Sequence, residues 1–299
     1  MSDAENLRAR LTRKPIVVAP GVFDALTAHL AERAGFSTLY VSGAAIAYTR
    51  LGRPDIGLVA MNEVADTVAL IRDRVTAHLI VDADTGYGNA LNVGRTMRLF
   101  ERAGANAIQL EDQDFPKRCG HLDDKALIPA EEMIGKIKAA LDARTSRETL
   151  VIARTDAVAV EGFEGAIARA ASYRDAGADL LFVEAPKTRA ELQRIPAAVN
   201  GVPLMANMVE GGKTPPLAAA DLEAIGFSLV IFPGAIVRAL ARTATEFYAA
   251  LAKHGTSESF LDRMYDFTAL NDVIGTPQII ELGKEYEATR PDGKKGRGK

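Results

Sequence analysis

The segment ERAGANAIQLEDQ, residues 101–113, contains the pattern on which the whole chain is built. Its first part reads as a helix that ends at Gly104, because glycine suits the left-handed conformation that follows a helix. A mostly apolar run, Ala107–Leu110, comes next and ends in two carboxylates. A buried parallel strand is apolar along its length, so charges directly after it need a separate explanation. The segment predicts a helix, a buried parallel strand and functional groups at the strand's carboxyl end.

The same unit recurs along the chain. Helical patterns such as residues 93–103 and 166–176 alternate with short runs rich in Val, Ile and Leu, and the glycine ending returns in RAGF (33–36) and DAGAD (175–179). The apolar runs begin near Ile16, Thr38, His78, Ala107, Leu150, Leu180, Pro203 and Ser228. Eight strand–helix units predict an α/β fold of the TIM type, a closed (β/α)8 barrel, with a doubly wound open sheet as the alternative.

The pattern changes after Lys253, where extra C-terminal helices are predicted. We expect a single domain over residues 1–299, because no linker-like segment divides the chain. Within it we expect the barrel over about 15–253, a C-terminal helical segment over about 256–288 and a disordered basic tail over about 290–299.

Composition limits the class of protein. A hydrophobic content of 48% and a charged content of 25% are typical of a soluble globular protein. A formal net charge of -3 favours neither nucleic acid nor a membrane as a partner. The chain has a single cysteine, and its polar start, residues 1–13, lacks the apolar core of a signal peptide. We therefore expect a cytoplasmic protein that acts on small molecules.

Polar side chains follow nearly every predicted strand. Because the carboxyl ends of barrel strands share one face, and active sites of barrel enzymes lie on that face, these side chains predict a site. One such residue alone is equally well explained as a helix N-cap or a salt bridge, but the recurrence over several strands favours a site. The residues are Asp24, Ser42, Asp82, Asp84, Glu111, Asp112, Gln113, Arg154, Thr155, Asp156, Glu184, Asn207 and Glu210.

The acidic members of this set indicate a metal ion. Asp82, Asp84, Glu111 and Glu184 offer oxygen ligands without a matching set of His or Cys, which favours Mg²⁺ or Mn²⁺ over zinc. Magnesium keeps several waters, so some of the four would contact it only through water. Arg154 would offer a fork of donors to a substrate carboxylate, or serve as a buried counter-ion for these acids.

The segment from 111 to 132 is long and polar for a barrel loop, which favours a lid over the substrate. It contains the single cysteine, Cys119, close to Lys117, Arg118 and His121. Cationic neighbours lower the pKa of a thiol, so we expect Cys119 to act as a proton donor or nucleophile. The alternative is an inert packing role.

The string KRCGH, residues 117–121, resembles the signature of the isocitrate lyase/phosphoenolpyruvate mutase superfamily. Within it the sequence is closest in motif to 2,3-dimethylmalate lyases, petal death protein and 2-methylisocitrate lyases, from about Ile16 to Glu285. The resemblance implies a (β/α)8 barrel whose last helix is exchanged between the subunits of a homodimer or homotetramer. The further motifs, in the family's order, are VDADTGYGN (81–89), LEDQ (110–113), ARTDA (153–157), EAP (184–186) and ANMVEGGKTP (206–215).

The same resemblance implies the ligands of the metal ion. Asp84 would bind Mg²⁺ directly, or Mn²⁺ in its place. Asp82, Glu111 and Glu184 would act mainly through metal-bound water.

It also implies catalytic and binding roles. Cys119 would donate a proton, poised by His121 and Glu111. Tyr40 matches the position proposed to take the proton of a substrate hydroxyl, with Lys117 assisting. The candidate substrate-binding residues are Ser42, Gly43, Ala44, Asp55, Arg118, Gly120, Arg154, Glu184, Asn207 and Phe267.

The implied reaction is retro-aldol cleavage of a 2-hydroxy (di)carboxylate. 2,3-Dimethylmalate or another alkylmalate would give pyruvate, or a related 2-keto acid, and a carboxylic acid. Phe267 stands where tricarboxylate-cleaving members carry an Arg, and Gln109 where 2-methylisocitrate lyases place a His, so a third carboxylate would lack a cation. The alternatives are a 2-methylisocitrate lyase, an oxaloacetate hydrolase or decarboxylase, a phosphonomutase of the carboxyphosphonoenolpyruvate or phosphoenolpyruvate mutase type, and a non-catalytic barrel that binds keto acids.

Overall fold

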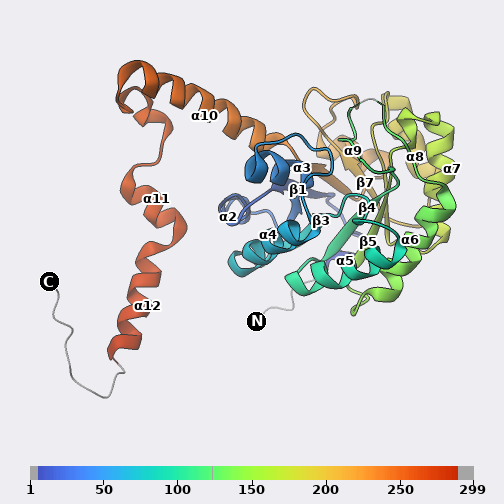
Figure 1. Ribbon diagram of the computed structural model, residues 1–299, viewed down its shortest axis with the longest axis horizontal. Coiled ribbons are helices and arrows are strands. Elements are labelled where there is room, and N and C mark those ends of the chain that lie inside the picture. The colour runs from blue at the N-terminus through green and yellow to red at the C-terminus, as the bar shows by residue number, and fades with distance from the viewer. Residues whose placement is uncertain (1–5, 123, 289–299) are drawn as a thin grey trace. The chain divides into compact units, whose positions relative to one another are not determined.

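The computed structural model describes residues 6–122 and 124–288. Its strands pair in chain order and close into a parallel barrel, because Val17 of the first strand lies opposite Leu229 of the last (Figure 1). The predicted (β/α)8 fold is confirmed, and the open sheet is excluded. The strands are β1 (Val17–Val22), β2 (Thr38–Val41), β3 (His78–Asp82), β4 (Ala107–Glu111), β5 (Leu150–Thr155), β6 (Leu180–Val183), β7 (Leu204–Asn207) and β8 (Leu229–Phe232).

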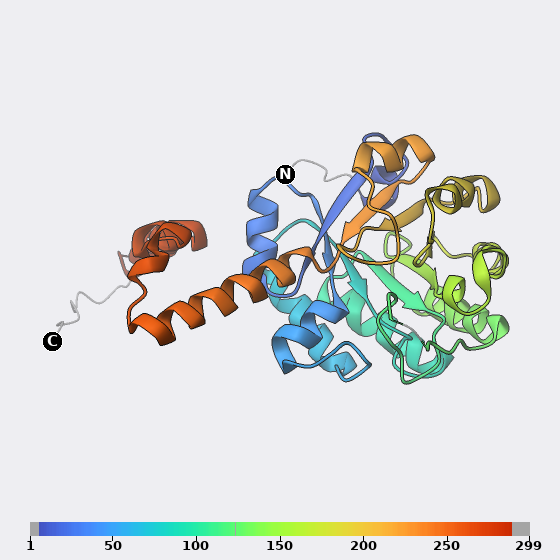
Figure 2. The same ribbon diagram turned by 90° about the horizontal axis from the view of Figure 1, so that it is seen from above.

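Helices follow the strands in turn and cover the outside of the barrel (Figure 2). Several begin at a side chain that accepts a backbone N–H, as Asp24 does from Thr27 at the start of the first of them. Two short helices, α3 (Gly43–Ile46) and the π-helical η1 (Ala47–Leu51), come before α4. The covering helices are α2 (Ala25–Arg33), α4 (Met61–Arg74), α5 (Ala90–Ala103), α6 (Ala130–Ala143), α7 (Gly162–Asp175, after the short η2, Ala157–Ala159), α8 (Arg189–Ala198) and α9 (Ala219–Ile225). The longer α10 (Ala235–His254) follows β8.

The barrel interior is filled by an apolar cluster at the amino ends of the strands. Val17, Leu150 and Leu229 belong to it. Leu7 of α1 (Leu7–Arg10) and the adjacent Leu11 join the same cluster, so the first helix closes this end of the barrel. The opposite, carboxyl end is left for polar side chains.

The contacts of the chain divide it into two compact units, residues 1–239 and 240–299. The second unit contains the predicted C-terminal helices: η3 (Glu258–Arg263), α11 (Phe267–Ile274) and α12 (Thr276–Ala288). A break separates the first two, because Asp266 accepts the backbone N–H of Ala269 and so starts a new helix.

Three predictions about organisation stay predictions: the single domain over residues 1–299, the exchange of the last helix and the cytoplasmic location. The basic tail over about 290–299 lies outside the described residues. Among the helices of residues 6–122 and 124–288, none combines the length and the apolar character that crossing a bilayer requires.

Candidate active site

Alternation along the strands carries a set of polar side chains into the barrel mouth. On β5, Leu150 and Ile152 belong to the interior cluster, so Arg154 also points inward. On β6, Phe182 belongs to that cluster, and Glu184 is the next inward position. The same rule applied to β3 through β7 gives the buried inward polar set Asp82, Gln109, Glu111, Arg154, Glu184 and Asn207.

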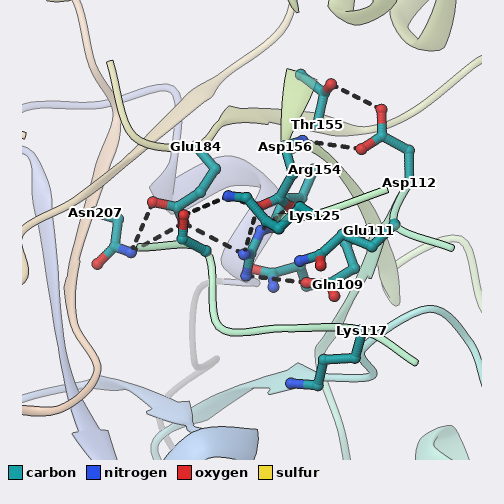
Figure 3. Close-up of polar contacts among 12 residues, drawn as sticks. Gln109, Glu111, Asp112, Lys117, Lys125, Arg154, Thr155, Asp156, Glu184 and Asn207 are labelled. Carbon is teal, nitrogen blue, oxygen red and sulfur yellow. Dashed lines mark hydrogen bonds and ion pairs between the residues drawn. The ribbon is translucent and has the colours of Figure 1, made fainter. Parts of the chain in front are cut away.

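Arg154 lies among three carboxylates (Figure 3). Its Nε donates to Asp156 Oδ2 over 2.8 Å, and its Nη1 lies 3.1 Å from Glu111 Oε2. Its Nη2 lies 3.7 Å from Glu184 Oε2. Burial opposes the charge of the guanidinium, but Asp156, Glu111 and Glu184 together raise its pKa. Arg154 is therefore a buried counter-ion, which was the alternative to a purely substrate-binding role.

Glu184 is held in its ionised form. Burial works against the charge, but Arg154 and a hydrogen bond from His121 lower the pKa of Glu184 to about 2. His121 Nδ1 accepts the backbone N–H of Lys213 over 3.0 Å, so a neutral ring carries its proton on Nε2, 3.2 Å from Glu184 Oε1. Asn207 Nδ2 donates to Glu184 Oε2 over 3.1 Å. Loops after β4 and β7 thus meet on one carboxylate.

A second group of charges surrounds a small space beside Gly43. A Cβ on this glycine would lie 3.3 Å from Asp82 Oδ2 and 3.4 Å from Asp84 Oδ1, so both carboxylates face this space. Lys117 Nζ lies 2.7 Å from Asp84 Oδ1 and also pairs with Asp55. Burial, opposed by Lys117 and assisted by Asp82, raises the pKa of Asp84 to about 7. One lysine does not balance the negative charge gathered here.

The closing loop, which we define as residues 113–122 and 124–129, lies directly on the mouth. A Cβ on Gly120 would stand 2.5 Å from Arg154 Nη2 and 2.7 Å from Glu184 Cγ, an approach that requires glycine. Gln113 fixes the start of the loop through two hydrogen bonds to the backbone of Arg118. Its Oε1 accepts the Arg118 N–H over 2.9 Å, and its Nε2 donates to the Arg118 carbonyl over 2.8 Å. The loop is therefore closed over the mouth in this structure.

A cavity of about 680 Å³ opens beside Asp84 and Lys117. Cys119, Arg154 and Glu184 are not among the residues that line it. The cavity thus reaches the mouth at Asp84 and Lys117. Its apolar lining residues are Leu58, Val59, Met61, Tyr87, Phe115 and Ile128.

A family model described as phosphoenolpyruvate phosphomutase matches residues 7–252. The chain belongs to the phosphoenolpyruvate mutase/isocitrate lyase superfamily. The prediction made from the KRCGH motif is thereby confirmed. The 2,3-dimethylmalate lyase of Eubacterium barkeri is 41% identical over 290 residues, which is 97% of this chain and 100% of that protein. The 2-methylisocitrate lyase of Aeropyrum pernix is 47% identical over 269 residues, 90% of this chain and 86% of that protein.

Solved structures of the superfamily share the whole fold. The crystal structure of 2,3-dimethylmalate lyase superposes with a TM-score of 0.89 at 34% identity, covering 97% of both chains. That of phosphonopyruvate hydrolase, in complex with oxalate and Mg²⁺, has a TM-score of 0.84 at 31% identity, covering 94% of this chain and 97% of that one. The chain is accordingly an enzyme of this superfamily of lyases and mutases.

The residues on the Gly43 side of the mouth fit a magnesium ion. Asp82 and Asp84 face one space, and Glu111 Oε1 is buried without a hydrogen-bond partner among the described residues. Within residues 6–122 and 124–288, no group of three or more His, Cys, Asp or Glu side chains is placed to hold a metal ion by itself. The two carboxylates that face one space suit Mg²⁺, which typically binds one or two carboxylates and fills its other positions with water and substrate. The ligand set with Glu184 as a water-mediated member stays a prediction.

The role of Tyr40 as base stays a prediction. Its hydroxyl donates to Gln109 Oε1 over 3.1 Å, and Gln109 Nε2 donates to Asp82 over 3.2 Å. Burial and the charge of Asp82 raise the pKa of Tyr40, so the phenol is protonated before substrate binds. Burial opposes the charge of Lys117, but Asp84 and Glu111 raise its pKa, so this amine also stays protonated.

The expected lowering of the Cys119 pKa is wrong. Burial raises the pKa of this half-buried thiol, because the cationic side chains next to it in sequence point elsewhere. Lys117 pairs with Asp55 and Asp84, and the Arg118 guanidinium lies 3.3 Å from Asp124. The raised pKa favours the thiol over the thiolate at neutral pH, which suits a proton donor better than a nucleophile.

The other predicted binding residues are distributed unevenly. Ser42 caps α3 by accepting the N–H of Ala45 over 3.2 Å, which places Gly43 and Ala44 at the mouth. Arg118 has a side chain that is 45% exposed and lies beside a surface acid, outside the buried group. Phe267 starts α11 in the second unit, so its predicted role in substrate choice stays a prediction.

Some polar residues at the strand ends belong to a structural network outside the barrel. Asp112 follows Glu111 and so faces the opposite side, where it accepts bonds from Thr155 Oγ1 (2.7 Å) and the Tyr173 hydroxyl (2.8 Å). Asp24 is a helix cap, and Glu210 pairs at the surface with Arg238. The N-cap and salt-bridge interpretation holds for these positions.

Lys125 is a residue of the mouth that sequence reasoning missed. Its side chain is fully buried, and its Nζ lies 2.9 Å from Asp156 Oδ1. No local pattern reveals it, because the partner is 31 positions away.

Replacing Asp84 by Asn should weaken Mg²⁺ binding by about 100-fold or more, since the losses seen for outer-shell groups are already 10–100-fold. Isothermal titration with MgCl2 measures this directly. Asp73→Asn, an exposed change of the same type on α4, should bind like the wild type. Equal affinities for all three proteins would place the ion elsewhere.

Proposed function

We propose that this chain is a Mg²⁺-dependent carbon–carbon lyase that cleaves a 2-alkylmalate such as 2,3-dimethylmalate. The C2–C3 bond breaks, the 2-hydroxyl gives its proton to a base, the role predicted for Tyr40 with Lys117 assisting, and C2 becomes the carbonyl of pyruvate. C3 keeps the electron pair and takes a proton from Cys119 to give propionate. The observation that carries the proposal is the half-buried thiol of Cys119, whose pKa is raised, next to a glycine that lies on Arg154 and Glu184. A cleavage that leaves electrons on carbon needs a proton donor at this place.

The groups of the mouth would bind the two ends of the substrate. Arg154 supplies the positive charge for a substrate carboxylate, and Asn207 and Glu184 are fixed beside it. Asp84 and Asp82 would hold the magnesium ion, which when bound supplies a Lewis acid that lowers the cost of negative charge on the C2 oxygen. The closed loop would exclude water, so that the new carbanion takes its proton from Cys119.

The substrate class is proposed from the relatives and from this chain's own residues. The relative from Eubacterium barkeri that matches 97% of this chain is named 2,3-dimethylmalate lyase. The cavity beside Asp84 has an apolar wall that includes Leu58 and Val59, which suits methyl substituents. 2-Methylisocitrate is the second candidate, because the 2-methylisocitrate lyase of Aeropyrum pernix is 47% identical. We also expect the enzyme to be a homo-oligomer.

A phosphonomutase has no carbanion to protonate. Such an enzyme would leave Cys119 without a use, and a barrel that only binds keto acids would leave both the thiol and the paired carboxylates idle. The lyase reaction uses all of these groups, which is why we prefer it.

An assay for 2-keto acid release should show turnover of 2,3-dimethylmalate that requires Mg²⁺ and stops with EDTA. We expect kcat/KM at least about tenfold above that for 2-methylisocitrate, because the extra carboxylate would lack a cation. Isocitrate, oxaloacetate and phosphonopyruvate are the comparison substrates. A preference for 2-methylisocitrate would overturn the substrate but not the reaction, whereas conversion of phosphonopyruvate alone would overturn both.

Replacing Cys119 by Ser should lower kcat by roughly 10²–10⁴-fold while leaving pyruvate affinity unchanged, because only proton donation is lost. In the wild type the same role gives a pH dependence. The thiol must be protonated and its pKa is raised, so the rate should hold through neutral pH and fall only above about pH 8.5.

Leu122→Ser, an exposed position of the same loop, is the control and should retain the wild-type rate. Full activity of the Cys119→Ser protein would remove the thiol from the reaction.

A further inference from the structure

Lys125 is a fully buried cation in the closing loop. Its Nζ lies 2.9 Å from Asp156 Oδ1 and also donates to the carbonyl of Gly120. The side chains of both Lys125 and Asp156 are 0% exposed. A lysine is almost never buried completely unless it is paired, since removing its charge from water is costly. Such a site in a surface loop points to a specific function for the ammonium group.

Asp156 connects this lysine to the substrate-binding arginine. Its Oδ1 accepts from Lys125 and, over 3.0 Å, from Arg154 Nη2, while its Oδ2 accepts from Arg154 Nε over 2.8 Å. The backbone N–H of Asp156 donates to Asp112 Oδ1 over 2.9 Å, which fixes the carboxylate to the end of β4. Asp156 is therefore a rigid bridge between the loop and Arg154.

The bond to Gly120 connects the same ammonium to the proton donor. Gly120 directly follows Cys119 and lies against Arg154 and Glu184. In Figure 3 the Lys125 side chain lies with Arg154 and Glu184, whereas Lys117 lies apart from them. One charged group thus holds the turn that carries the thiol and neutralises the carboxylate that orients Arg154.

We propose that Lys125 is a positioning residue that keeps the closing loop shut and couples its closure to the orientation of Arg154. When the loop opens, Lys125 must leave Asp156, and Arg154 alone then balances three buried carboxylates. When the loop closes, Lys125 neutralises part of the negative charge of Asp156. The positive charge of the Arg154 guanidinium is then less offset by Asp156 and attracts a substrate carboxylate more strongly. The kinetic part of this inference rests on the proposed lyase function, whereas the loop-closure part does not.

The single cysteine makes loop closure measurable without turnover. Iodoacetamide labels Cys119 faster when the loop is open, and Mg²⁺ with oxalate should slow labelling by holding the loop shut. The test variants are Lys125→Met, which removes the charge, and Lys125→Gln, whose amide can still donate to Gly120 but cannot pair with Asp156. Lys138→Met, an exposed change of the same type on α6, is the control.

We expect both Lys125 variants to be labelled at least about tenfold faster than the wild type and to lose protection by Mg²⁺ and oxalate, because Asp156 loses one of its two cationic partners and the closed loop loses its ion pair to Asp156. The kcat for 2,3-dimethylmalate should fall roughly 10²-fold through misplacement of the thiol and Arg154, while Mg²⁺ affinity is unchanged. Lys138→Met should behave as the wild type in every assay.

Wild-type labelling rates and intact protection in folded Lys125→Met and Lys125→Gln would reduce Lys125 to a structural brace and overturn the inference, even if their melting temperatures fall. Circular dichroism checks folding, and if one variant does not fold the other decides. If no 2-hydroxy acid is turned over by the wild type, the proposed function fails but the labelling result still decides on Lys125.

Discussion

The ion pairs of Arg154 are the interaction on which the rest of the site depends. Glu111 is its register neighbour on β4, and Asp156 and Glu184 complete the set of acids around it. Three buried carboxylates near one another are unstable without a cation, because each loses its hydration. The guanidinium lies 5.4 Å from the centre of the Phe182 ring, so it also forms the boundary between the apolar interior and the polar mouth.

The positions of the other groups of the mouth follow from the position of Arg154. Glu184, kept ionised by Arg154, receives His121 from the closing loop and Asn207 from β7. Gly120 fits the space directly above the guanidinium. Among the residues that the structure describes, Lys117 is the one cation paired with the carboxylates beside Gly43, so they favour a divalent cation there. The site thus has one side with its own counter-ion and one side that suits a metal.

The fold was predictable because strand alternation and glycine-ended helices are local patterns. The inward set was predictable in part. Successive side chains of a strand face opposite sides, so Glu111 and Asp112 cannot both point into the barrel. This alternation separates Glu111, which contacts Arg154 in the mouth, from Asp112, which bonds Thr155 outside it. The strand-end pattern and the charged loop supplied Asp84 and Cys119 as candidates, and the motif resemblance supplied their roles as metal ligand and proton donor.

Contacts made by the closing loop were not predictable. The thiol pKa depends on where the neighbouring cations point, and Lys117 turns toward Asp55 and Asp84 instead of Cys119. The partner of Lys125 is distant in sequence, so the lysine has no local signature. Both features arise from tertiary packing of a loop on the barrel mouth. That is why spacing along the chain carries no information about them.

Binding of oxalate in the presence of Mg²⁺ to Arg154→Lys, measured by isothermal titration, tests most directly whether Arg154 organises the site. Lysine keeps the charge but cannot reproduce the planar fork that meets several carboxylates at once. The account predicts a folded variant that still binds Mg²⁺ and loses oxalate affinity by roughly 10²-fold, on the order of one charge-assisted bidentate pair. Wild-type oxalate affinity in Arg154→Lys would contradict the account and leave the guanidinium as a structural counter-ion only.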